Sequence, residues 1–193
     1  MNDQSSLREF LFKSLTIEDA LNDMEQKGIS VRSPVDSQAL QRVVSLEEFP
    51  EDIRSAAMKA FPAYLAFFCL ENSARDLISD RLSERHGPEW WSSKVSNSIR
   101  SSVTKRQEKE GVNRWYVKRG AAPIYYTDFG DLKSIIQQNW EDFSDLFPDV
   151  NWVINRFTEL EASRNIVAHN NVLEGNEVER MRIYLVDWIR QVG

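Results

Sequence analysis

The sequence predicts an all-α protein, a bundle of about six or seven helices preceded by a small helical extension. Three observations predict it. Apolar residues recur at three- and four-residue spacings along most of the chain, helix-capping and helix-ending residues separate these stretches, and neither repeats nor low-complexity tracts interrupt them. With 193 residues, 41% of them hydrophobic and 28% charged, the chain is long and apolar enough for one sizeable core.

The first fifty residues predict two short helices. Thr16 caps the first, acidic residues follow it, and Gly28 closes it. Asp36 caps the second, which carries Leu40 and Val43. We therefore expect a helical extension over residues 1–50, either a subdomain or the first layer of the main helical domain, residues 51–193.

Residues 53–85 predict the central helix of the core, preceded by a shorter helix. We place the break near Phe61-Pro62, since proline disfavours helix in the residue before it, and the end at Gly87-Pro88. The expected core face is broad. It comprises Tyr64, Leu65, Phe67, Phe68, Leu70, Ala74, Leu77, Ile78 and Leu82. Cys69 is expected to be a small buried hydrophobe.

Residues 88–127 are less regular. Trp115-Tyr-Val and Ile124-Tyr-Tyr, on either side of Gly120, could pair as one short β-hairpin. Helical spacing returns after Asp128 and continues to Pro148. We expect two further helices, one over about residues 152–169 and a last one from about residue 176.

The charge is unevenly distributed. The net charge is −6, but the segment 94–119 holds eight basic residues against Glu108 and Glu110, which makes it +6 and the remainder −12. The basic residues are Lys94, Arg100, Lys105, Arg106, Lys109, Arg114, Lys118 and Arg119. The segment is either a solvated connection or a phosphate-binding surface, with aromatic residues nearby as stacking faces. Those aromatic residues are Trp115, Tyr116, Tyr125 and Tyr126.

Several classes of protein are excluded by pattern. The seven glycines are isolated, so there is no phosphate-binding glycine loop, and two histidines and one cysteine have no zinc-ligand spacing. No metal or cofactor is expected. The single cysteine, the absence of a secretory signal and the lack of an apolar run of about 20 residues favour a cytoplasmic protein without a membrane partner. His86, at a helix end, is expected to be a surface or capping residue.

The chemistry-bearing pattern lies in the helix expected over 152–169. On a helix of about 100° per residue, Arg164 falls in the middle of an apolar stripe, where a guanidinium is costly unless it is paired or binds a phosphate. Asn165 and His169 lie one turn apart on an adjacent face. His169 also stands at the helix end, where the negative pole stabilises an imidazolium. The alternative is structural: Arg164 pairs with a core carboxylate such as Glu71 or Asp76, and His169 caps the helix.

The run Arg164-Asn-Ile-Val-Ala-His169 matches the R-x4-6-H motif of the HEPN superfamily, at the end of the penultimate long helix where that family carries it. The flanking residues are also similar to a bacterial HEPN subfamily over roughly residues 55–193. These are Tyr126-Thr-Asp-Phe-Gly-Asp-Leu, Asn139-Trp140 and Phe143. The chain thus resembles a HEPN protein.

This resemblance implies a helical homodimer, and many members are metal-independent endoribonucleases of toxin–antitoxin or phage-defence systems. Arg164 and His169 of both protomers would face one cleft; on an ideal helix they point about 140° apart. His169 would transfer the proton, Arg164 would stabilise the transition state, and Asn165 would orient His169 or hold a phosphate oxygen.

The same resemblance bears on partners. RNA is the expected substrate, with its backbone held by basic residues of the charged segment. The candidates are Lys105, Arg106, Arg114, Lys118 and Arg119. An antitoxin or a defence-system protein would be a further partner. The alternative is a catalytically silent HEPN-like dimerisation and binding module that regulates an enzyme such as a nucleotidyltransferase or an ATPase.

Overall fold

The computed structural model describes residues 46–192, and its contacts divide the chain into two units, residues 1–50 and 51–193. The helices expected from Thr16 and Asp36 lie outside the described residues. Of the first unit the structure describes one 3-10 turn, η1 (Leu46–Glu48). The second unit contains seven α-helices and a second 3-10 turn among its described residues, so it is all-α as the sequence predicts.

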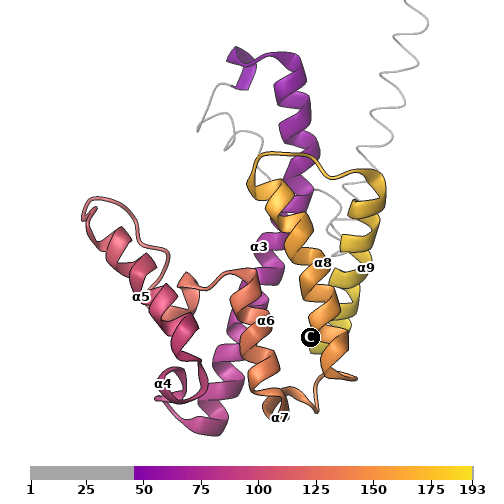
Figure 1. Ribbon diagram of the computed structural model, residues 1–193. Helices are drawn as coiled ribbons and strands as arrows, with labels where there is room; N and C mark the ends of the chain where they lie inside the picture. The colour runs from indigo at the N-terminus through magenta and orange to yellow at the C-terminus, as the bar shows by residue number, and fades with distance from the viewer. Residues whose placement is uncertain (1–45, 193) are drawn as a thin grey trace, which may run out of the picture. The chain divides into compact units, whose positions relative to one another are not determined.

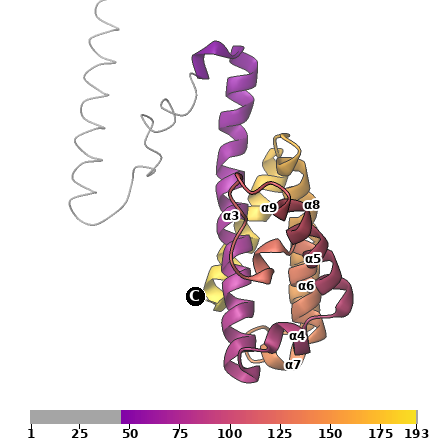
Figure 2. The ribbon, with the colours of Figure 1, turned by 90° about the vertical axis from the view of Figure 1, so that its left-hand side faces the viewer.

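One helix, α3 (Glu51–His86), runs the full length of the second unit, and its first turns project beyond the neighbouring helices in both views (Figures 1 and 2). The predicted break at Phe61-Pro62 is wrong, because the helix continues through Pro62. Proline removes the hydrogen bond to the carbonyl four residues earlier, at Met58. Both Met58 and Pro62 are exposed, so water can solvate that carbonyl.

The predicted end of α3 is confirmed. Gly87 has a φ of +74°, a backbone conformation that residues with a side chain rarely adopt. Its N–H donates to the carbonyl of Ser83 at 2.8 Å. The helix therefore stops where glycine permits a left-handed residue.

The two faces of α3 differ more than the sequence indicates. The core face consists of Ala63, Phe67, Leu70, Ala74, Ile78 and Leu82. Tyr64, Leu65, Phe68 and Cys69 were expected in the core but are exposed. In length and hydropathy α3 would suffice to cross a membrane, although no membrane span was predicted from the sequence, and 17% of its most apolar 18-residue window is buried. The spacing of apolar residues in the sequence does not show which of these side chains other helices cover.

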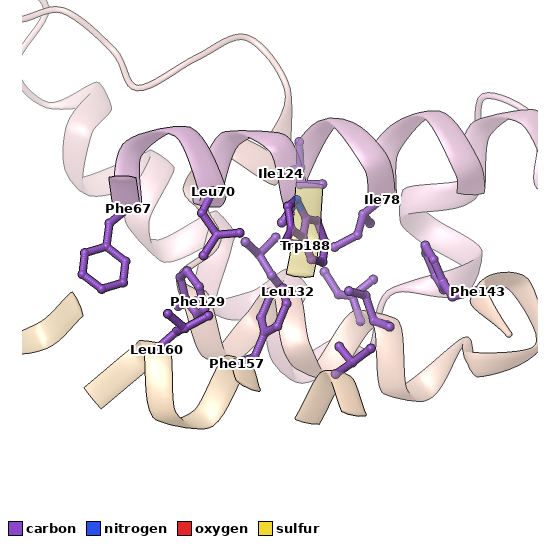
Figure 3. Packing of buried hydrophobic residues seen from close by; sticks show 14 of the residues in the cluster. Phe67, Leu70, Ile78, Ile124, Phe129, Leu132, Phe143, Phe157, Leu160 and Trp188 are labelled. Carbon is purple, nitrogen blue, oxygen red and sulfur yellow. The ribbon is translucent and has the colours of Figure 1, made fainter. Parts of the chain in front are cut away.

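Three further helices complete the bundle: α6 (Phe129–Gln138), α8 (Val150–Ala168) and α9 (Gly175–Val192). Each of them contacts α3, and α6 also packs along α8 (Figure 1). Their inward residues interlock with the core face of α3 (Figure 3). The rings of Phe129 and Phe157 lie 4.9 Å apart, and the indole N–H of Trp188 donates to Ser73 Oγ at 2.9 Å.

The helix expected between Asp128 and Pro148 is interrupted. A short helix, α7 (Trp140–Phe143), follows α6 after a non-helical residue, Asn139. The Asn139 side-chain amide donates to the carbonyl of Ile135 at 2.8 Å and to that of Lys94 at 3.1 Å. The interruption therefore ties the end of α6 to the last residue of α4 (Trp90–Lys94).

The predicted β-hairpin is wrong. Its second half forms η2 (Pro123–Tyr126), and its first half is a turn after α5 (Asn97–Gly111), so no strand occurs in the described residues. Pro123 fixes φ and has no N–H to donate to a ladder. The N–H groups of Tyr125 and Thr127 instead donate to the carbonyls three residues earlier, at Ala122 and Ile124, so they are not free to pair with a second strand.

Candidate functional site

The end of α8 is a left-handed cap built around the predicted motif. His169 is the last half-helical residue, and Asn170 follows with a φ of 59°. The Asn170 N–H donates to Val167 at 3.0 Å, and the Asn171 N–H to Ile166 at 3.1 Å. These two bonds are the Schellman pattern, which satisfies carbonyls that a helix end otherwise leaves free. Backbone hydrogen bonds therefore fix the position of His169.

The side chains of Asn165 and His169 lie at this end and are exposed. Within the described residues neither side chain donates or accepts a hydrogen bond, and neither contacts Arg164 in a hydrogen bond or ion pair. The structure thus places the three motif residues on the last two turns of α8 without joining them into one network in a single chain.

Arg164 also lies near this end of α8 and is partly buried, with 34% of its side chain exposed. Its Nε is 3.6 Å from Oε2 of Glu71, a carboxylate only 12% exposed. The structural alternative from the sequence, pairing with Glu71, is therefore present, whereas Asp76 is exposed. At 3.6 Å the contact is an ion pair and is longer than a hydrogen bond.

Glu71 is itself held by Arg75, whose Nη2 donates to Glu71 Oε1. Arg75 also donates to the carbonyl of Thr127 at 3.1 Å and to Asn72 Oδ1 at 3.1 Å. Arg75 was not among the site residues predicted from the sequence, although the four-residue spacing of Glu71 and Arg75 on a helix favours such a pair. Arg75 thus fixes the carboxylate that faces Arg164.

Arg106 has a structural position. Its guanidinium donates to Asp131 Oδ2 at 2.8 Å, to Asp128 Oδ2 at 2.7 Å and to the Tyr126 carbonyl at 2.6 Å. Asp128 and Asp131 form a reciprocal capping box at the start of α6. Desolvation of the guanidinium lowers the pKa of Arg106, but the hydrogen bonds and charges of Asp131 and Asp128 raise it by more. The pKa of Arg106 therefore lies above its ordinary value. Arg106 therefore connects α5 to the start of α6.

The other predicted RNA-binding residues are more open. Lys105, Arg114 and Lys118 are exposed. Arg119 forms an ion pair through Nε with Glu110, and its Nη groups make no hydrogen bond within the described residues. The two exposed rings of Trp115 and Tyr116 meet edge to face, 5.4 Å apart.

Of the other two predicted stacking residues, Tyr126 is buried and therefore has no free face. Its burial, and next the carboxylate of Glu110, raise the pKa of its phenol. Tyr125 is only partly buried, and it lies beside Arg119 and Arg164 around a hollow of about 340 Å³.

An apolar surface adjoins the motif. The first half of α3 exposes Ile53, Met58 and Tyr64, with Met58 56% exposed. Beside them is a groove of about 550 Å³ whose wall includes Val167 and Asn170 of the α8 end. Clustered exposed apolar side chains mark interaction surfaces. This surface lies next to the predicted catalytic histidine.

The second histidine, His86, is half-buried at the far end of α3 and its Nε2 lies 2.8 Å from Oδ2 of Asp142. Its sequence interpretation as a capping residue is only partly right, because the ring joins α3 to α7. His86 contacts none of the motif residues.

Comparison with known proteins gives one family. Residues 65–193 match the family model described as Swt1-like HEPN, which covers two thirds of the chain and includes Arg164, Asn165 and His169. No curated protein and no solved structure matched the chain. The recognition of a HEPN protein from its motif and flanking residues is thereby confirmed.

Proposed function

The chain belongs to the Swt1-like HEPN family, and we propose on this premise that it is a metal-independent endoribonuclease acting in a toxin–antitoxin or phage-defence system. The observation that carries the proposal is the end of α8. There the family motif keeps its arginine, asparagine and histidine, and a Schellman cap fixes His169 with its ring exposed.

The proposed reaction uses the nucleophile of RNA itself. His169 removes the proton from a 2′-hydroxyl, or delivers one to the leaving 5′-oxygen. The 2′-oxygen bonds to phosphorus as the bond to the 5′-oxygen breaks, leaving a 2′,3′-cyclic phosphate and a 5′-hydroxyl. Arg164 stabilises the additional negative charge of the pentacoordinate transition state. Asn165 orients His169 or holds a phosphate oxygen.

A second protomer is part of the proposal. Arg164 and His169 share no hydrogen bond or ion pair in the structure, and on an ideal helix they point about 140° apart. The apolar surface of Ile53, Met58 and Tyr64 borders the α8 end, so a homodimer formed there would bring a partner's motif to the same cleft. Lys105, Arg114, Lys118 and Arg119 would hold the RNA backbone on either side.

Two observations favour the alternative function, a silent binding module for a partner enzyme such as a nucleotidyltransferase or an ATPase. Arg164 already has a carboxylate partner in Glu71, and the ring of His169 lacks an orienting partner among the described residues. In that case Arg164 would be a structural cation, and the apolar surface would receive the partner.

The deciding experiment incubates purified protein with total RNA and tRNA in EDTA, beside His169→Ala and Arg164→Ala, with end-group analysis of the fragments. Removing an electrostatic stabiliser should lower the rate by about 10²–10³. Arg182→Ala, a surface arginine paired with Glu179, is the matched control and should cleave normally. Metal-dependent cleavage, equal cleavage of DNA, or unfolding of Arg164→Ala would contradict the proposal.

Dimerisation has its own test. Met58→Glu places a charge in the apolar surface and should convert the dimer to monomer in light scattering after gel filtration. Val117→Glu, at an exposed apolar residue of the turn after α5, should leave the dimer intact. A wild-type protein that is monomeric at all concentrations would remove the second protomer from the mechanism.

A further inference from the structure

The hollow beside Arg164 combines features that no motif describes. It encloses about 340 Å³ between α3, the end of α8 and the segment that leads into η2. Pockets for small organic ligands span about 300–1,000 Å³. Its wall includes the aromatic rings of Phe68 and Tyr125 and the guanidinium groups of Arg119 and Arg164.

Two guanidinium groups in this wall keep free donors. Arg164 approaches Glu71 only to 3.6 Å, and none of its N–H groups makes a hydrogen bond within the described residues. Arg119 uses Nε for Glu110, and its Nη groups are likewise unbonded there. Arg75, in contrast, is occupied by Glu71, Asn72 and Thr127. A phosphate is the ligand that such free guanidinium forks bind best.

The ring of Tyr125 in this hollow is held in place by the backbone at Gly120. A Cβ added to Gly120 would come within 2.6 Å of the Tyr125 ring, so this ring lies directly on the glycine backbone. Phe68, one turn of α3 before Asn72, is 57% exposed. A fixed, partly open aromatic face beside a phosphate site suits a nucleobase, because every base has a face that stacks.

We propose that this hollow binds one nucleotide of single-stranded RNA next to the cleaved phosphodiester, with its base against Tyr125 and Phe68 and its phosphate between Arg119 and Arg164. The inference rests on the proposed ribonuclease function, since Arg164 belongs to both sites. It adds Tyr125, Phe68 and Arg119 as residues that position the substrate. It also explains the glycine at position 120, where any side chain would displace the Tyr125 ring.

The test measures binding apart from cleavage. The full chain carrying His169→Ala is titrated with 5′-AMP, 5′-UMP and inorganic phosphate by calorimetry. Nucleotides should bind more tightly than phosphate, because a stacked base contributes about 1–3 kcal/mol, roughly fivefold to 150-fold in Kd. Tyr125→Leu should remove this advantage, and Arg119→Gln should weaken all three ligands. Arg182→Gln is the matched control and should bind normally.

Gly120→Ala gives a second variant in case Tyr125→Leu unfolds, because it moves the ring without altering it. Phosphate binding as tightly as the nucleotides, or nucleotide affinity unchanged in both Gly120→Ala and Tyr125→Leu, would overturn the inference. The two proposals fail separately. Nucleotide binding without RNA cleavage would refute the ribonuclease alone, and His169-dependent cleavage with binding indifferent to Tyr125 and Arg119 would refute the hollow alone.

Discussion

The Arg164 Nε lies 3.6 Å from Oε2 of Glu71. The motif arginine at the end of α8 is therefore held by a carboxylate on α3, and only 12% of that Glu71 side chain is exposed. The other oxygen of Glu71 accepts a hydrogen bond from Arg75. A guanidinium at this distance is oriented yet keeps its N–H groups for another anion. The relationship makes Glu71 a positioning residue for Arg164.

Glu71→Gln is therefore expected to slow RNA cleavage by on the order of tenfold to hundredfold, as small displacements of a catalytic group do. It should also lower the free energy of unfolding, because Arg75 loses its charged partner. Cleavage rates measured well below the unfolding temperature separate the two effects. Asp76→Asn, an exposed carboxylate on the same helix, should change neither. Normal cleavage by a folded Glu71→Gln protein would refute the positioning role.

Arg106→Ala should affect stability rather than RNA binding. It removes three hydrogen bonds and leaves Asp128 and Asp131 without their cation, at a cost of about 1–3 kcal/mol. Urea denaturation measures this cost. Arg114→Ala, at an exposed position, should stay within about 0.5 kcal/mol of wild type. Equal stability of the two variants would contradict the structural role of Arg106.

Asn170 tests the cap that positions His169. Its φ of 59° costs a residue with a Cβ about 1–2 kcal/mol, a cost that asparagine partly avoids and glycine does not incur. Asn170→Ala should lower the thermal midpoint and the cleavage rate together, since the helix end frays. Asn170→Gly should retain both. A loss of cleavage in the glycine variant would mean that the Asn170 side chain takes part directly.

The ion pair between Arg81 and Asp145 predicts a pH dependence. The hydrogen bond that Arg81 donates to the Asp145 carboxylate lowers the pKa of Asp145 below its ordinary value. A lowered folded-state pKa means that the pair stabilises above the unfolded-state pKa, and that this contribution disappears as pH falls through the folded-state pKa. The difference in thermal midpoint between wild type and Asp145→Asn should therefore be largest at neutral pH and vanish in acid. Since Asp145 is 55% exposed, the difference should be small and shrink with added salt.

The sequence predicted the elements whose causes are local. The end of α3 at Gly87 and the start of α6 at Asp128 follow from side chains and backbone within one turn, and both are confirmed. The break at Pro62 was wrong, because solvent access, which depends on the whole fold, lets α3 continue through a proline. The hairpin around Gly120 was wrong, because the N–H groups of Tyr125 and Thr127 bond to carbonyls three residues earlier, in a 3-10 turn.

The candidate site divides in the same way. By itself the sequence determined the helical class, the family and the order Arg164, Asn165, His169, since periodicity and motif spacing are properties of neighbouring residues. Only the tertiary structure decided that Glu71 faces Arg164 and that Arg119 and Tyr125 share its hollow. These residues are far apart in the chain and have no spacing in common. Glu71 and Arg164 are brought together by the packing of α8 against α3, which buries the apolar stripes of both helices, and Tyr125 by the packing of η2 against α3.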